Sequence, residues 1–189
     1  DGTGWAGIQS AESFAHFDEE ALDRMDYYVS QLAEQGLYIK LSPTVGVKLG
    51  KEDLAKIPYA SEFGELKRNR LETGHGSIFL SSELQDLQIA QTVRLLEHRN
   101  PYTGQRYADD PAIFCVEMFN EDSVLFPGTN VQLQKRPTLR ARAAEKFSRW
   151  LRQRYGTEDA WLEAWGAGAL YGGAGAAHPH LEYLIGESL

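Results

Sequence analysis

Residues 112–119 read Ala-Ile-Phe-Cys-Val-Glu-Met-Phe, and Glu117 is the only charged residue among them. A run that is apolar on both faces is typical of a parallel β-strand covered on both sides, whereas a strand with one wet face alternates apolar and polar residues. Asp109-Asp110-Pro111 precedes the run, and Asn120-Glu121-Asp122-Ser123 comes directly after it. The sequence therefore predicts a central strand with polar side chains where it ends.

A helix, a strand and a second helix are expected before this run. Asp18 is placed to cap the first helix, and after a glycine the β-prone run Leu37–Leu41 follows. Ser82 and Gln85 have the spacing of a capping box, which predicts a helix over Glu83–Arg99. The buried face of that helix is expected to carry Ile89, Val93 and Leu96.

Two more helices complete the pattern, one introduced by Thr138 and a shorter one capped by Thr157. Their tryptophans are expected in the core: Trp150, Trp161 and Trp165. This βα alternation predicts an α/β fold with long loops after both strands, at the end where βα barrels and open sheets place their sites. Neither strand is joined to its helix by a nucleotide-binding glycine fingerprint, so a nucleotide-binding fold is disfavoured.

Composition narrows the function classes. Of the 189 residues, 42% are hydrophobic, as in a globular domain, and 27 acidic against 19 basic residues give a net charge of −8. That balance argues against a nucleic-acid partner, and the apolar runs are too short to span a membrane. Cys115 is the only cysteine, which excludes an intrachain disulfide. His178 and His180 have a spacing seen in metal sites, but no carboxylate cluster accompanies them, so neither a metal nor a cofactor is expected.

Glu121 is the main candidate for chemistry. A carboxyl group at the end of a buried strand enters a cleft that shields it partly from water, where it can donate a proton. The alternative interpretation is a polar turn in which Asn120 or Asp122 caps the next segment, and the dipeptide alone favours it. Glu117 lies on the same strand face as Glu121, and a charge there must be paired, for example by a basic side chain of a neighbouring strand in a barrel lumen.

Val116-Glu117-Met118-Phe119-Asn120-Glu121 resembles the fourth-strand signature of the retaining clan-A glycoside hydrolases, the (β/α)8 group that includes family 5 cellulases and β-mannanases. The resemblance covers roughly residues 12–166. Its other parts are Ala21–Tyr28, Asn100–Gly104, Asp109–Ala112, Trp150-Leu151 and Tyr155–Thr157.

This resemblance implies a glycosidase that cleaves β-linked glycans by retaining double displacement. Glu121 would be the general acid/base, Asn120 would bind the sugar 2-hydroxyl, and Glu117 would be a structural residue of the barrel lumen. A bulge or bend at Asn120 is then expected, because neighbours on an ideal strand point apart. The alternatives are a non-catalytic carbohydrate-binding relative of the same fold and a structural α/β domain.

Retaining hydrolysis also needs a second carboxylate about 5–5.5 Å from the first, which this family carries on its seventh strand. By the resemblance, the two strands expected here correspond to the third and fourth strands of the barrel. The resemblance therefore implies that residues 1–189 form part of a (β/α)8 TIM barrel, inactive alone, with the remainder of the barrel as a partner. A secreted or periplasmic bacterial location fits an acidic glycan hydrolase.

Aromatic side chains in loops are candidates for sugar-stacking platforms. Trp5 and Phe126 are the first choices, since Phe126 comes five residues after Glu121, and Tyr102 is a third. His75, in the long loop after the first strand, is a further candidate for substrate contact.

Overall fold

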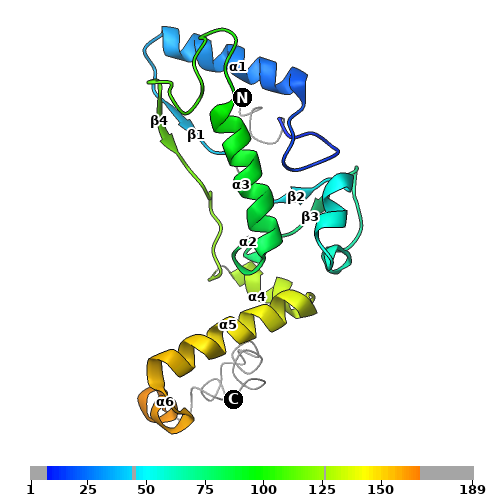
Figure 1. The fold of residues 1–189 in the computed structure, drawn as a ribbon, viewed down its shortest axis with the longest axis vertical. Helices are drawn as coiled ribbons and strands as arrows, with labels where there is room; N and C mark the ends of the chain where they lie inside the picture. Colours follow the sequence, from blue (N-terminus) through cyan, green and yellow to red (C-terminus); the bar gives the residue numbers. More distant parts are fainter. Residues whose placement is uncertain (1–7, 44–45, 126, 167–189) are drawn as a thin grey trace. The chain divides into compact units, whose positions relative to one another are not determined.

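In a computed structural model of the chain, the structure describes residues 8–43, 46–125 and 127–166. They divide into two compact units, the first ending at Thr129 and the second beginning at Asn130. The first unit contains α1 (Glu19–Glu34), β1 (Ile39–Leu41), β2 (Lys48–Leu49), the 3-10 helices η1 (Lys51–Lys56) and η2 (Ala60–Phe63), β3 (Leu71–Glu72), α2 (Ser77–Leu80), α3 (Ser82–Glu97) and β4 (Ile113–Val116) (Figure 1). The boundary falls within α4 (Pro127–Gln134), and α5 (Pro137–Tyr155) and α6 (Glu158–Trp165) come after it.

The first predicted helix is confirmed as α1. The Asp18 side chain accepts a hydrogen bond of 2.8 Å from Ala21 N, and two glutamates occupy the first turn, where the helix dipole favours negative charge. Gly36 lies just after the helix with a positive φ of 73°, a conformation that glycine adopts without steric cost.

The predicted strands pair in parallel. Ile39 of β1 lies opposite Ile113 of β4, and Leu41 lies opposite Val116, with an irregularity after Ile39 (Figure 1). The expectation that β4 is a covered central strand is not met within the described residues, where β1 is its only partner. Phe114 is consequently 64% exposed, because burial of both faces needs layers that these residues do not supply.

A hydrophobic cluster packs α1 and α3 against the two strands. Its members are Ile8, Ala21, Val29, Leu41, Leu95 and Tyr107, with Phe17, Leu22, Met25, Ile39, Leu96 and Ile113 at its margin. Residues far apart in sequence meet in this cluster, so it holds β1 and β4 against α1 and α3.

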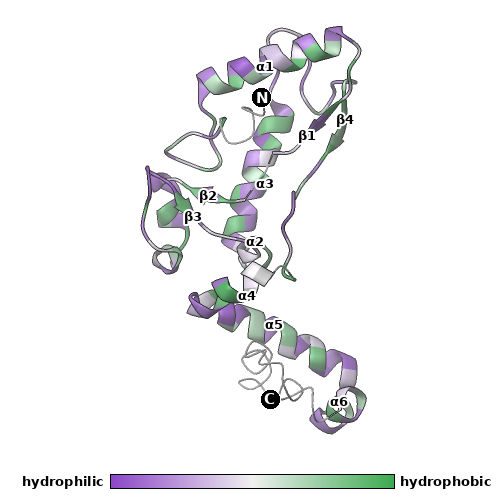
Figure 2. Ribbon diagram, turned by 180° about the vertical axis from the view of Figure 1, so that it is seen from behind, coloured by the Kyte–Doolittle hydropathy of each residue, from purple (hydrophilic) through white to green (hydrophobic). Residues whose placement is uncertain are grey.

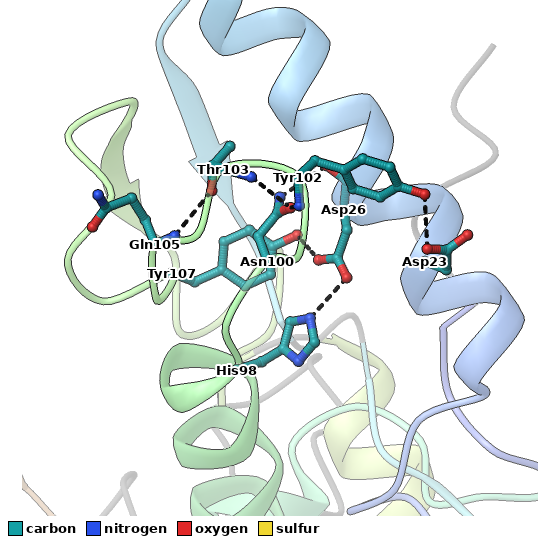
Figure 3. Close-up of polar contacts among 8 residues, drawn as sticks. All are labelled: Asp23, Asp26, His98, Asn100, Tyr102, Thr103, Gln105 and Tyr107. Carbon is teal, nitrogen blue, oxygen red and sulfur yellow. Dashed lines mark hydrogen bonds and ion pairs between the residues drawn. The ribbon is translucent and has the colours of Figure 1, made fainter.

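A buried carboxylate ties α1 to the connection between α3 and β4. Figure 3 shows Asp26, which is 2% exposed, between His98 and Tyr107. The Tyr107 hydroxyl donates to Asp26 over 2.6 Å, and His98 Nε2 lies 2.8 Å from the other carboxylate oxygen. The Asn100 amide donates to the Asp26 carbonyl over 2.8 Å. Burial, together with the hydrogen bond to Asp26, raises the pKa of Tyr107.

Helix α3 is present as predicted, but its cap and its buried face differ from the prediction. Ser81, not Ser82, accepts from Leu84 N over 3.1 Å, and Gln85 donates to the Ile78 carbonyl instead of closing a capping box. Ile89 and Val93 are 56% and 46% exposed. The buried face consists of Leu84, Leu87, Gln88, Gln91, Thr92 and Leu95.

Residues 46–81 contain several small elements, as long loops often do. Antiparallel β2 and β3 form a short ladder, with Leu49 opposite Leu71. The buried Asp53 of η1 accepts hydrogen bonds from the Ser13 hydroxyl, Phe14 N and Gly50 N. This carboxylate fastens residues 13–14 to the segment that carries β2.

In the second unit, Pro137 begins α5 and the Thr157 hydroxyl caps α6. Hydrophobic and hydrophilic residues alternate along α5 (Figure 2). Trp161 is buried as expected, whereas Trp150 is 47% exposed and stacks on Phe147, so its placement in the core was wrong. The sequence interpretation also missed α4, which begins in a stretch assigned to a loop.

The described residues form two two-stranded sheets, and the (β/α)8 fold class stays a prediction. None of the helices in the described part of the chain combines the length and apolar character needed to cross a membrane.

Candidate functional site

A pocket of about 430 Å³ lies beyond the carboxyl ends of β1 and β4. It is lined by Gly46, Val47, Lys48, Glu72, Gly74, His75, Asn120, Glu121 and Asp122. Three residues selected from the sequence, His75, Asn120 and Glu121, therefore line one pocket. The two segments that come after the parallel strands face each other across it, as polar groups at neighbouring strand ends are expected to do.

Glu121 is exposed at this pocket and has an unusual backbone conformation. Its φ is 47°, in the left-handed region, which costs a residue with a side chain about 1–2 kcal/mol. A bend was expected at Asn120, and the structure places the left-handed residue one position later. β4 ends at Val116, earlier than the predicted run, so Asn120 and Glu121 come four and five residues after the strand. The turn at Glu121 lets both residues line the same pocket.

The segment that leads to Glu121 is anchored from α2 and α3. The Gln88 amide donates to the Met118 carbonyl over 2.9 Å, and Gln88 is only 3% exposed. The Phe119 ring lies against Phe79, with centroids 4.9 Å apart. Buried Gln88 on α3 thus has a partner for its amide, as a buried polar group requires, and it holds the backbone three residues before Glu121.

Asp122, the next residue along, bonds to backbone on two segments. Its Oδ1 accepts from Gly76 N over 2.9 Å and from Ser123 N over 2.9 Å. The same oxygen lies 3.6 Å from His75 Nδ1, and the Asp122 side chain is 11% exposed. The carboxylate therefore connects the loop that carries His75 to the turn that carries Glu121.

Gly76 also fits closely against the opposite side of that turn. Its φ is 74°, and a Cβ there would overlap the side chain of Thr129. Thr129 is 2% exposed, and its hydroxyl donates to the Ser123 carbonyl over 2.9 Å. Only glycine satisfies both the left-handed backbone and the available space at this position.

The pocket lining also includes an ion pair between strands β2 and β3. Lys48 Nζ lies 3.5 Å from Glu72 Oε1, and the two residues face each other in the ladder. Both side chains are substantially exposed, so this pair adds little to stability, but it fixes two opposite charges at the rim.

Glu117 lies outside this pocket and is paired. Its carboxylate accepts from the Ser42 hydroxyl over 2.7 Å and from Lys40 Nζ over 3.0 Å. The Ser42 hydrogen bond and then Lys40 lower the pKa of the Glu117 carboxyl. Lys40 is the basic partner on a neighbouring strand that the sequence could not identify. A residue of a barrel lumen is expected to be largely buried, but the Glu117 side chain is 27% exposed, because among the described residues β1 supplies neighbours on one side only.

Of the aromatic candidates, the structure describes only Tyr102, which does not line the pocket. Tyr102 lies against α1, where its hydroxyl donates to Asp23 over 2.9 Å (Figure 3). Its ring also meets that of Tyr27 edge-on. The Asp23 hydrogen bond raises the pKa of Tyr102. Trp5 and Phe126 lie outside the described residues.

Among the described residues, no group of three or more His, Cys, Asp or Glu side chains is arranged so that it could hold a metal ion. His178 and His180 are not among these residues.

The sequence interpretation missed the other lining residues, chiefly Asp122, Lys48 and Glu72. It assigned Asp122 only a capping role toward the next residues, and Asp122 does bond to Ser123 N. Its second contact, with Gly76, joins residues 46 positions apart and has no local signal.

Comparison with known proteins places the chain near the glycoside hydrolases. It is 28% identical over 108 residues to mannan endo-1,4-beta-mannosidase 2 of Oryza sativa subsp. japonica. The match covers 56% of this chain and 23% of that protein, so the chain spans under a quarter of the length of this relative. No family model and no solved structure matches the chain. The similarity suggests a distant relative of glycoside hydrolases.

Proposed function

We propose that this chain carries the acid/base part of a glycoside hydrolase that cleaves β-linked glycans with retention of configuration. The observation that carries the proposal is the meeting of Asn120, Glu121 and His75 at one pocket beyond the ends of two parallel strands. The likeness to a plant mannosidase supports the same class of reaction. A β-mannan is therefore the first substrate to test.

Glu121 is exposed and not partly shielded from water as the sequence predicted. A glycosidic oxygen can therefore come within hydrogen-bond distance of its carboxyl group, as general acid/base chemistry requires. In the retaining mechanism that group protonates the leaving oxygen and then, as a carboxylate, takes a proton from the water that releases the sugar. The neighbouring Asn120 would donate an amide hydrogen bond to the sugar 2-hydroxyl.

A retaining mechanism also needs a carboxylate nucleophile about 5–5.5 Å from the acid. The other two carboxylates of the pocket are engaged, Glu72 with Lys48 and Asp122 with two backbone amides. We assign the nucleophile to neither of them. In this proposal it comes from the remainder of a (β/α)8 barrel, in which β1 and β4 are the third and fourth strands and Glu117 faces the lumen.

The test is Glu121→Gln in the protein that carries this chain, with a manno-oligosaccharide and an aryl β-mannoside as substrates. Turnover of the oligosaccharide should fall by about 10²–10⁴-fold, the usual contribution of general acid/base catalysis. The aryl mannoside should lose less in its first step, because a good leaving group departs without protonation.

Glu65→Gln is the matched control, since Glu65 is exposed and does not line the pocket. It should behave as the unmodified protein. Equal oligosaccharide turnover by the Glu121 and Glu65 variants would refute the proposal. Glycan binding without turnover in the unmodified protein would favour the carbohydrate-binding relative instead.

A further inference from the structure

The turn at Glu121 holds a conformation that an isolated peptide would not keep. A residue with a side chain stays in the left-handed region only when the surrounding structure fixes its neighbours. Glu121 is exposed, whereas Asp122 is 11% exposed and makes two backbone hydrogen bonds. Gln88 and Phe79 anchor the residues before the turn, and the side-chain contacts directly after Glu121 lie on Asp122.

Both hydrogen bonds of Asp122 act on backbone next to residues that line the pocket. Ser123 N lies two residues after Glu121, and Gly76 N comes directly after His75. Hydrogen bonds from amides to a carboxylate are among the stronger ones in proteins, and here one oxygen accepts both. Movement of Asp122 would thus displace Glu121 and the His75 loop together.

Thr129 closes the arrangement from the other side. Its hydroxyl holds the Ser123 carbonyl, and its side chain fills the space beside Gly76. Residues 75–76 are accordingly held between Asp122 and Thr129. These contacts fix the loop that carries His75 against the turn that carries Glu121.

We propose that Asp122 is a positioning residue for the reaction proposed above: by accepting from the Gly76 and Ser123 amides, it holds Glu121 in the left-handed turn and His75 at the same pocket. This inference rests on the proposed function for its catalytic consequence. We call Asp122, Gly76, Ser123 and Thr129 the clamp. Whether the clamp holds the backbone can be tested without measuring activity.

Two substitutions at Asp122 separate the clamp from the charge. Asp122→Ala removes the acceptor, so kcat on the manno-oligosaccharide should fall by about 10²-fold, the cost of a misplacement of about 1 Å, while KM changes less. Asp122→Asn keeps Oδ1 as an acceptor and loses the negative charge, so it should restore most of the kcat lost in the alanine variant. The aryl mannoside should lose less than the oligosaccharide, as in Glu121→Gln.

Amide hydrogen exchange at Gly76 and Ser123 tests the clamp without reference to activity. Loss of a hydrogen bond to a carboxylate should speed exchange at Gly76 by about tenfold or more in Asp122→Ala. Exchange should stay close to that of the unmodified protein in Asp122→Asn.

Asp110→Ala is the matched control. Asp110 is 7% exposed and accepts from Ala112 N over 2.9 Å just before β4, outside the pocket. Its loss should lower stability and leave kcat and Gly76 exchange unchanged.

The inference is overturned if Asp122→Ala leaves Gly76 exchange unchanged, or if the alanine and asparagine variants lose kcat equally. It is also overturned if Asp122→Ala lowers turnover of both substrates to the same degree, as a structural role alone would. The proposed function fails separately, if Glu121→Gln retains full oligosaccharide turnover, and in that case the exchange experiment still decides whether the clamp exists.

Discussion

Lys40 Nζ and Glu117 Oε2 lie 3.0 Å apart although 77 positions separate the two residues in sequence. The pair crosses from β1 to the end of β4, and Ser42 donates to the same carboxylate oxygen. The ion pair therefore forms only when the two strands are paired in parallel. That pairing also brings together the segments that line the pocket.

Glu117→Gln should lower stability slightly at neutral pH and not at low pH. The Ser42 hydrogen bond and Lys40 lower the folded-state pKa of Glu117 below the ordinary value of 4.5, so the stabilisation is present above that value and lost as the pH falls through the lower, folded-state pKa. Urea unfolding of both proteins at pH 7, 5, 4 and 3 measures the difference. A difference that does not shrink as the pH falls would contradict this prediction.

Tyr107→Phe should destabilise the protein by about 1.5–3 kcal/mol, because it removes a hydrogen bond to the buried carboxylate of Asp26. Tyr102→Phe is the control, since its bond to Asp23 is exposed, and it should cost much less. The pKa of Tyr107 is raised in the folded protein, so the stabilisation from its hydroxyl depends on pH. That stabilisation is present below the ordinary tyrosine pKa of 10.0 and is lost as the pH rises above it. Equal effects of the two substitutions would argue against the buried network.

Gly76→Ala should cost more than Gly36→Ala. Both glycines have φ near 74°, so both substitutions carry the left-handed penalty of about 1–2 kcal/mol. A Cβ on Gly36 meets nothing, whereas a Cβ on Gly76 overlaps Thr129. The difference between the two unfolding free energies measures that overlap, and equal values would show that Thr129 does not pack against Gly76.

Ser81→Ala should destabilise the protein by about 0.5–2 kcal/mol, the usual cost of a lost helix cap. Ser81 accepts from Leu84 N and also meets the Tyr59 hydroxyl. Ser82→Ala, at an exposed residue inside the helix, should be nearly neutral. Thermal unfolding of the two variants distinguishes the cap in the structure from the one predicted by the sequence.

Local signals in the sequence sufficed for α1, α3, α5 and α6 and for the parallel strands β1 and β4, but not for α4 or for the β2–β3 ladder. Asp18 and Thr157 cap helices because their side chains bond to amides three residues away. The face that α3 buries was not predictable in this way. Apolar spacing favoured Ile89 and Val93, but Gln88 is buried because it bonds to the Met118 carbonyl, a contact 30 positions distant.

In the candidate site too, the residues with a local sequence signal were predicted and those placed by long-range contacts were not. Asn120 and Glu121 come after a recognisable strand, and the long loop made His75 a candidate. Lys48 and Glu72 line the pocket because β2 and β3 pair, and the runs that form them are two residues each, too short to leave a pattern.

The clamp joins two turns whose residues are made at different times during synthesis. The β2–β3 pairing and the α2–α3 contacts join residues within 46–97, whereas the Asp122 hydrogen bond to Gly76 closes a loop of 46 positions and the β1–β4 pairing closes one of more than 70. Closing long loops carries an entropic cost before any contact repays it, so such contacts form late. A nascent chain that has emerged only as far as residue 110 contains the lining residues from 46 to 75 and lacks Asn120, Glu121 and Asp122, so the pocket is complete only after the long-range pairing has formed.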